Sequence, residues 1–497
     1  MIPNAFLVAL TLRSLGLLLP HTFFQPDEFY QAFEPAYSAV FGHGFLTWEW
    51  RDLPYTATQG GRPVDLLKRA VCGGRLRSWV WPGVFMAVYK SLDMLGLQDT
   101  EWALFLSLTS LFNAHLLPRA LSTSPETLLT TAALVYYPDT CSSELKAPGP
   151  ENLDPVAMDR AEGKASLLVL LSATVVDYLM VGRLVLPVFT FFHQNVLRNV
   201  AAFYGGTGLA YHLVQSLPLL LFPLWYWWAK GFLAAVLPRS VTPVSLARLD
   251  VTRPMRRLGH AVCFTIAVFS LSPHSEWRFL HPLLPQLFMF ALPALQADYW
   301  ASMVGCFQKP GMTFRQWVRI PKRAFYLILL APVLPFLYLN VFHGGAQVEV
   351  MNKLRRGEYG TVSKVAVLMP CHSTPWSSHL GRNITGWFLT CDPPLQSAAH
   401  HWTQQDMFYD QPVSYVQEVF PYPPMPLGAV GHQDSTPEMP SHVLLFGEAL
   451  QRSQGNTTVR EALGIRGYHE VDNLWNGFDV AQDEDKRRGG VRVWARQ

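Results

Sequence analysis

Long apolar runs separated by short polar stretches dominate the first 342 residues of the chain. The runs lie at 4–24, 79–97, 102–120, 127–137, 166–181, 184–194, 211–237, 258–273, 280–297 and 324–342. Because roughly 20 apolar residues cross a bilayer, most of these runs predict transmembrane helices. The first run ends without the small residues of a cleavage site, so we expect it to be retained as a helix. The polar stretch 139–165 predicts a loop.

The pattern changes after residue 342, where apolar and polar runs are shorter and mixed. The runs at 365–370 and 443–446 are typical of short buried strands beside helices. We therefore expect a polytopic α-helical membrane part over residues 1–342 and a small α/β domain over residues 343–497.

Basic residues predict which side of the membrane each loop faces. The segments 239–257 and 309–323 each carry five lysines and arginines, and basic loops stay in the cytosol. The turn at 274–278 and the part 343–497 would then face the lumen. Asn383 and Asn456 stand in glycosylation acceptor sequences, which agrees with a luminal C-terminal part.

Composition supports a membrane protein, since 50% of the residues are hydrophobic and only 15% are charged. A net charge of +3 is too small to indicate nucleic-acid binding. The six cysteines are scattered, so no metal site is predicted. Cys371 and Cys391 form a disulfide if they lie in an oxidising lumen, and two free thiols remain equally open. A Cys371–His372 catalytic pair is disfavoured, because adjacent side chains rarely point at each other.

Three acidic residues follow the first apolar run, within residues 22–34. Pro26, Asp27 and Glu28 are typical of a helix start, and Pro35 predicts that this helix is short. Asp27 and Glu34 would share one face and phenylalanines another, as in an amphipathic helix lying on a membrane surface. The alternative is that the acids only mark a helix start on a solvated face.

The segment 24–28, Phe-Gln-Pro-Asp-Glu, and the segment 40–51, which contains Leu-Thr-Trp-Glu-Trp-Arg, resemble the first luminal loop of a known family. It is the family 22 mannosyltransferases of the endoplasmic reticulum, whose donor is dolichyl phosphate mannose. The likeness is greatest to members that add the third mannose of the glycosylphosphatidylinositol (GPI) precursor. It implies a multi-pass endoplasmic reticulum protein of GT-C architecture, with residues 25–78 as the first luminal loop of a catalytic domain 1–342.

The match is imperfect in the middle of the chain. Residues 176–183 resemble a family segment loosely, and residues 371–375 resemble the start of its luminal region. Relatives carry further apolar helices between the parts matching 123–128 and 176–183, where this chain has the polar stretch. A faulty gene model and a shortened, impaired protein both remain open.

The resemblance implies that Asp27 is the general base, with Glu28 as a substitute or an acceptor-orienting group. A carboxylate suits this role because the attacking hydroxyl must lose its proton. Attack opposite the phosphate inverts the anomeric centre, and the resemblance implies an α-1,2 bond to the second mannose of the GPI precursor. We expect no cofactor, because fixed cations stabilise a departing dolichyl phosphate.

Two further groups are candidate substrate-binding residues. Glu49, Trp50 and Arg51 offer a hydroxyl acceptor, a sugar platform and a phosphate-binding cation, although tryptophan is also common at membrane interfaces. His274 and Arg278 are suited to the lipid phosphate, with Glu276 orienting Arg278. The alternative for this second group is a tight turn with an interfacial ion pair.

Other functions remain open at this point. A related mannosyltransferase acting on a lipid-linked oligosaccharide is the nearest rival. A membrane transporter or scaffold is less favoured, because charges cluster at helix ends and in one acidic loop instead of within the spans. The expected partners are the two lipid-linked substrates and membrane lipid, and no protein partner or nucleic acid is deduced.

Overall fold

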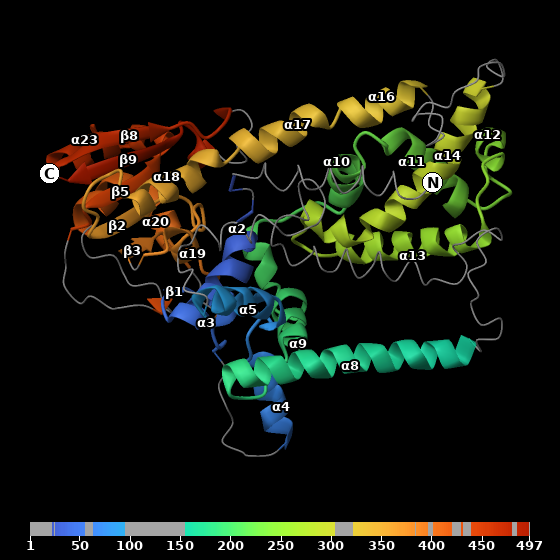
Figure 1. The fold of residues 1–497 in the computed structure, drawn as a ribbon, viewed down its shortest axis with the longest axis horizontal. Helices are drawn as coiled ribbons and strands as arrows, with labels where there is room; N and C mark the ends of the chain where they lie inside the picture. The colour runs from blue at the N-terminus through green and yellow to red at the C-terminus, as the bar shows by residue number, and fades with distance from the viewer. Residues whose placement is uncertain are drawn as a thin grey trace. The chain divides into compact units, whose positions relative to one another are not determined.

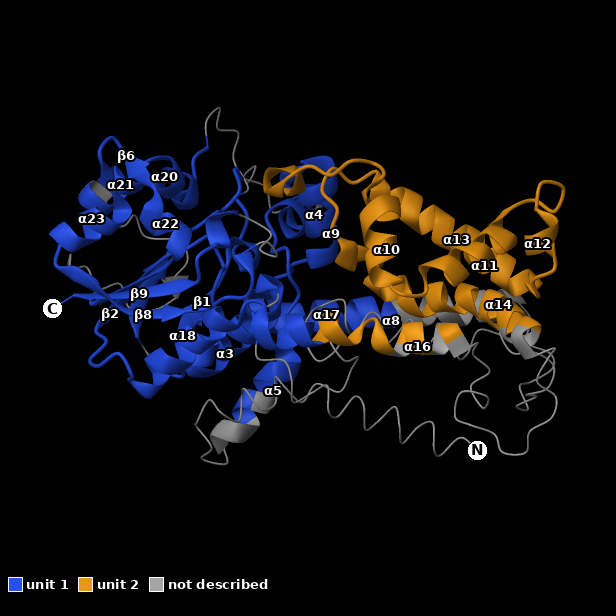
Figure 2. Cartoon of the chain, turned by 90° about the horizontal axis from the view of Figure 1, so that it is seen from above, with its two compact units in different colours: residues 1–122, 167–200, 337–497 blue, residues 123–166, 201–336 orange. Residues whose placement is uncertain are grey.

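The computed structural model describes residues 22–23, 25–54, 63–94, 155–303, 322–382, 384–395, 401–419, 429–430, 439–479 and 485–496. The chain divides into two compact units, coloured separately in Figure 2. The first unit takes its described residues from 1–122, 167–200 and 337–497, and the second takes them from 123–166 and 201–336. The acidic stretch near the N-terminus therefore belongs to the same unit as the C-terminal part of the chain.

A five-stranded mixed sheet lies in the C-terminal part of the first unit (Figure 1). Its strands, in spatial order, are β3 (Thr385–Phe388), β2 (Lys364–Leu368), β5 (His442–Phe446), β9 (Val491–Arg496) and β8 (Tyr468–Leu474). β2 is parallel to β3 and β5, whereas β9 is antiparallel to β5 and β8. The predicted α/β character of this part, with strands near 365–370 and 443–446, is confirmed.

Helices cover both faces of this sheet. They are α18 (Gly345–Arg356) on one face, and α20 (Gln404–Asp410), α22 (Gly447–Gln451) and α23 (Val459–Ile465) on the other. Successive side chains of a strand point to opposite faces, so Val367 packs with α18 and Leu368 packs with the other three helices. A sheet covered on both sides needs apolar residues on both, which explains the continuous apolar run of β2.

The acidic stretch forms one continuous helical segment from Pro26 to Phe41. It consists of α2 (Pro26–Glu28), the π-helical turn η1 (Phe29–Phe33) and α3 (Glu34–Phe41). The prediction that Pro35 ends this helix early is wrong. Proline has no N–H to donate to the carbonyl oxygen of Tyr30, five residues before it. That oxygen instead accepts the indole N–H of Trp50 at 3.0 Å. This bond from a distant tryptophan lowers the cost of proline inside the helix.

This helix is buried in protein on both faces. Phe29 and Phe33 are 4% and 2% exposed and belong to the same apolar cluster as α18 and the sheet. Glu34, on the other face, is fully buried. The prediction of an amphipathic helix lying on a membrane surface is therefore wrong, because the C-terminal α/β part covers the positions that were expected to face lipid and water.

The first unit contains further helices besides the acidic helix over residues 26–41. These are α4 (Pro63–Cys72), α5 (Val80–Met94), the second half of α8 (Pro155–Val181) and α9 (Pro187–Phe192). Asp177 of α8 accepts hydrogen bonds from the Trp79 N–H at 2.6 Å and the Ser78 hydroxyl at 3.1 Å, just before α5 begins. The predicted loop 139–165 is wrong from residue 155 onward, where α8 starts, and its earlier residues lie outside the described part.

The second unit is helical within its described residues. Its main helices are α11 (Trp225–Val236), α13 (Arg253–Ser270) and α14 (Leu284–Met303). They share an apolar cluster that includes Trp228, Ile266 and Phe290. Gly231 of α11 lies so close to α14 that a Cβ atom there would overlap the Phe290 carbonyl oxygen. This position therefore requires glycine for the two helices to pack.

Two helices of the described chain are long and apolar enough to cross a membrane, at Trp277–Asp298 and Tyr326–Arg356, and a shorter apolar helix lies at Leu167–Val181. These correspond to the predicted runs 280–297, 324–342 and 166–181. The runs 102–120 and 127–137 and nearly all of 4–24 lie outside the described residues. The helix Tyr326–Arg356 contains η7 (Tyr338–Phe342), left-handed Gly344 and α18, and it therefore continues across the expected domain boundary between residues 342 and 343.

Candidate active site

Asp27 and Glu28 stand in the first turn of the long helix and differ in exposure. The Asp27 side chain is partly exposed, whereas Glu28 is 7% exposed. A helix N-terminus favours a negative charge, so both carboxylates are in a supportive position. Of the two, Asp27 is the more accessible to solvent.

Glu34 joins this helix to the C-terminal α/β part. Its carboxylate accepts the Ser378 N–H at 2.7 Å and the Phe45 N–H at 3.4 Å. Burial raises the pKa of Glu34 to about 7, although these hydrogen bonds oppose the shift. Tyr30 makes a second link, since its hydroxyl donates to the Thr374 carbonyl at 2.9 Å. The helix that carries Asp27 is therefore anchored on a segment more than 300 residues away in sequence.

Glu49 and Trp50 make contacts within residues 25–79 of the first unit. Arg77 donates two hydrogen bonds to one Glu49 oxygen, at 2.7 and 3.1 Å, and Gln31 donates to the other at 3.4 Å. Trp50 is 1% exposed, packs against Trp79 with ring centroids 5.0 Å apart, and donates to Tyr30 as described above. These contacts explain both residues without a ligand, and Arg77 is a partner that sequence reasoning missed.

Arg51 reaches the C-terminal part. One guanidinium nitrogen lies 3.3 Å from the Asp392 carboxylate, and another donates to the Leu46 carbonyl at 3.2 Å. Burial raises the pKa of Asp392, and the Arg51 charge opposes that shift. Asp392 directly follows Cys391, so the pair lies beside the cysteines considered next.

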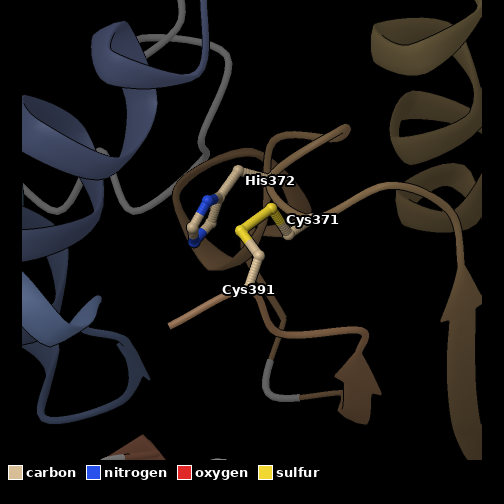
Figure 3. A group of neighbouring side chains, drawn as sticks. All are labelled: Cys371, His372 and Cys391. Carbon is tan, nitrogen blue, oxygen red and sulfur yellow. A yellow bond between two sulfur atoms is a disulfide. The ribbon is translucent and has the colours of Figure 1, made fainter. Parts of the chain in front are cut away.

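A disulfide joins Cys371 and Cys391, whose Cα atoms are 5.8 Å apart (Figure 3). His372 lies beside the disulfide in Figure 3. The ligand atoms of these three residues lie within 4.8 Å of one another, the only such group of metal-ligating side chains among the described residues. With both sulfurs in the disulfide, only the imidazole remains as a donor, so a metal ion would need reduced cysteines.

His372 and Asp392 each directly follow one of the bridged cysteines, so the disulfide brings these two segments together. The charges of Asp27 and Arg51 both act on the His372 imidazole. Its ring centroid lies 4.7 Å from that of Tyr30, one helical turn after Asp27. Sequence reasoning missed His372 and Asp392 as site residues. Pairing Cys371 with Cys391 is the signal that would have found them, because each lies one residue after a bridged cysteine.

His274, Glu276 and Arg278 come together in the second unit, where they precede or begin the 3-10 turn η6 (Trp277–Leu283). Glu276 Oε1 lies 3.3 Å from His274 Nε2 and accepts an Arg278 N–H at 2.7 Å. Burial alone would raise the pKa of Glu276, but hydrogen bonds from these two partners lower it to about 2. The hydrogen bond to Glu276 raises the pKa of His274. The contact by which Glu276 was expected to orient Arg278 is present.

Of the two predicted glycosylation sites, Asn456 is exposed in the turn between β6 (Ser453–Gln454) and β7 (Thr457–Thr458). An exposed turn is accessible to a glycan, and this position is therefore suitable for one. Asn383 lies outside the described residues.

The profile of the Alg9-like mannosyltransferase family matches residues 4–157 and 163–381. The chain belongs to this family. It is therefore a glycosyltransferase. Both the acidic helix and the loop that carries His372 lie within the matched residues.

Individual relatives are similar along nearly the whole chain. Proteins named GPI mannosyltransferase 3 from Yarrowia lipolytica and Drosophila melanogaster are 29% and 26% identical, over 99% and 89% of this chain and 96% and 79% of their own lengths. A human protein named GPI alpha-1,2-mannosyltransferase 3 is 25% identical over 89% of this chain and 80% of its own length. The Yarrowia alignment has 563 positions, more than the 497 residues here, so part of that relative has no counterpart in this chain. No solved structure matches this chain.

Proposed function

We propose that this protein transfers mannose from dolichyl phosphate mannose to the second mannose of the GPI precursor, forming an α-1,2 bond in the endoplasmic reticulum. Family membership supports mannose transfer. The names of the relatives from yeast, fly and human support the GPI acceptor, and the name of the human relative supports the linkage. The proposed organisation is a multi-pass membrane part with the acidic loop and the C-terminal α/β domain in the lumen.

The position of Asp27 carries the proposed mechanism. A general base must be accessible to the acceptor and ionised before the reaction. Asp27 is partly exposed in the first turn of a helix, where an acceptor can approach it. It takes the proton of the attacking hydroxyl while the C–O bond to phosphate breaks and the electron pair leaves with the phosphate. Attack from the opposite face inverts the anomeric carbon. The buried Glu28 is suited to positioning.

Cations supply the remaining chemistry in this proposal. Arg51, in the segment that follows the acidic helix, is proposed to bind a substrate phosphate. Within the second unit, His274 and Arg278 are proposed as a separate group that binds lipid phosphate. A guanidinium group binds phosphate through two parallel hydrogen bonds and carries a positive charge. In this proposal, no metal or other cofactor is required. Glu49, fixed by Arg77, is proposed to accept a sugar hydroxyl with its remaining lone pairs.

Complementation tests the reaction directly. The chain is expressed in cells that lack the third GPI mannosyltransferase, and GPI intermediates and lipid-linked oligosaccharides are both separated by chromatography. We expect the two-mannose GPI intermediate to be converted to the three-mannose form. A change in the oligosaccharides alone would support a lipid-linked oligosaccharide as the acceptor. If neither class of lipid changes while the protein is present in the membrane, mannose transfer by this shortened chain would be contradicted.

A further inference from the structure

The loop between β2 and α19 (Ser377–Leu380) is fixed from several directions. The Cys371 N–H donates to the Gln405 side chain at 2.8 Å, and the Gln347 side chain donates to the Ser373 carbonyl. The next carbonyl accepts the Tyr30 hydroxyl, and the disulfide ties Cys371 to the segment after β3. Three parts of the C-terminal domain and the acidic helix therefore hold one short loop in place.

His372, in the middle of this loop, has an unfavourable backbone conformation. Its φ angle is +55°, in the left-handed region that favours glycine. Among the described residues, the only other non-glycine residue with positive φ is Asn199. A strained residue that the surrounding structure holds in place is a reason to look for a function of its side chain.

The His372 side chain lies among aromatic rings, one of which, Tyr30, is one helical turn after the candidate base Asp27. Its ring centroid is 4.7 Å from that of Tyr30, with Phe45 and Phe388 at 6.5 and 6.2 Å. The side chain is nevertheless partly exposed, as Asp27 is. Aromatic walls with one polar group are typical of sugar and other small-ligand sites.

Burial lowers the pKa of His372 to about 4, with Asp27 opposing that shift and Arg51 adding to it. The imidazole is therefore neutral near pH 7. A neutral imidazole has one N–H donor and one nitrogen acceptor, whereas phosphate binding needs donors and positive charge. A sugar hydroxyl also both donates and accepts, so it is the group that a neutral imidazole fits.

We propose that His372 binds a mannose hydroxyl beside Asp27, so that the C-terminal domain supplies a substrate-contacting residue of the active site. This inference rests on the proposed function, since the ligand is a mannose of either the donor or the acceptor. It explains why the left-handed position carries histidine instead of glycine, and why both the disulfide and the acidic helix hold this loop.

Substitutions at position 372 separate the effect of the imidazole from the effect of the backbone conformation. His372→Gly removes the imidazole and relieves the backbone, so the loop is expected to fold. His372→Asn keeps a donor and an acceptor in a residue that tolerates positive φ. His469→Ala, at an exposed position of β8, is the matched control. Each full-length protein is purified in detergent, and its melting temperature is measured with and without ligand.

Two probes distinguish the source of the hydroxyl. One is a mannosyl phosphate on a short isoprenoid chain, and the other is a synthetic two-mannose glycolipid. We expect His372→Gly to weaken binding of at least one probe about tenfold, the effect of losing a hydrogen bond. His372→Asn should restore most of it, and His469→Ala should bind as wild type does. The probe whose binding is weakened identifies the donor or the acceptor.

Binding by His372→Gly equal to wild type for both probes would overturn the proposal, as would failure of His372→Asn to improve on His372→Gly. Mannose transfer is measured on the same preparations. If the wild-type protein binds a probe, this binding depends on His372 and no mannose is transferred, the proposed function is contradicted but the role of His372 is not. If neither probe binds the wild-type protein, both proposals are wrong.

Discussion

The two polar clusters of this protein are assembled in different ways. His274, Glu276 and Arg278 are alternate residues in one turn of the second unit, and their contacts are local. The cluster around Asp27 draws on three distant segments, with Arg51 paired to Asp392 and the charges of Asp27 and Arg51 acting on His372. The first cluster could be read from sequence spacing, whereas the second depended on which distant segments the fold brings together.

The clusters also differ in what holds them. An ion pair and a hydrogen bond on one carboxylate oxygen hold the local cluster. The distant cluster is held by the Cys371–Cys391 disulfide, the buried Glu34 and the packing of a helix against the sheet. Changes to these supports are therefore expected to have larger effects than changes in the local turn.

The largest effect is expected at Asp27 itself. Asp27→Asn removes the proposed base while keeping the shape of the side chain, and we expect mannose transfer to fall about 10²–10⁴-fold. Membranes containing equal amounts of each protein are assayed with radiolabelled donor. Asp410→Asn, at an exposed position of α20, is the control and should retain wild-type activity. Activity of Asp27→Asn within threefold of wild type would reject the assignment of the base.

Removal of the disulfide tests the support of the distant cluster. In the double variant Cys371→Ser, Cys391→Ser, the unfolded chain regains the freedom of a loop closed across 20 residues, which costs about 3 kcal/mol of stability. We expect a lower melting temperature and lower mannose transfer, and a reducing agent should lower both for the wild type but not for the variant. An unchanged melting temperature would show that hydrogen bonds alone fix the loop.

Glu34 is expected to make stability depend on pH. Its pKa in the folded protein, about 7, is above its ordinary value of 4.5, so the folded state binds the proton more tightly than the unfolded chain. Its contribution is complete below pH 4.5 and is lost as pH rises through 7, with a magnitude of about 3 kcal/mol. The melting temperature of wild type should therefore fall relative to Glu34→Gln between pH 5 and 7.5.

The exposed acid Glu358, paired with Arg356, gives the matched control for Glu34. Glu358→Gln should follow the wild-type pH profile, because surface ion pairs contribute little. A constant difference in melting temperature between wild type and Glu34→Gln at all pH values would show that Glu34 stays charged in the folded protein.

The smallest effect is expected in the local turn. Glu276→Gln removes the group that raises the pKa of His274 and orients Arg278. We expect the KM for the donor to rise about threefold, as for loss of a modest polar contact. The rise should be larger at pH 7.5 than at pH 5.5, because His274 then loses its proton more readily. Equal KM values at both pH values would argue that this turn does not bind the lipid phosphate.

The first 342 residues show where sequence patterns are informative and where they fail. The apolar runs at 280–297 and 324–342 correspond to long helices, since a continuous apolar run favours one regular element. The helix beginning at Pro26 was misread because the rule against proline inside helices considers only the local chain. The indole of Trp50 supplies the missing hydrogen bond to Tyr30, and sequence spacing does not show that contact.

The sequence by itself determined the chemistry available to this protein: an acidic loop, a basic and acidic turn, two bridgeable cysteines and an apolar pattern for helices and central strands. Those features depend on neighbouring residues and on which side chains are apolar. Only the tertiary structure decided that Glu34 is buried against Ser378, that Trp50 is buried against Trp79, and that His372 packs against Tyr30. Such contacts join residues hundreds of positions apart, and their energies depend on burial and geometry that exist only once the sheet and its helices have packed.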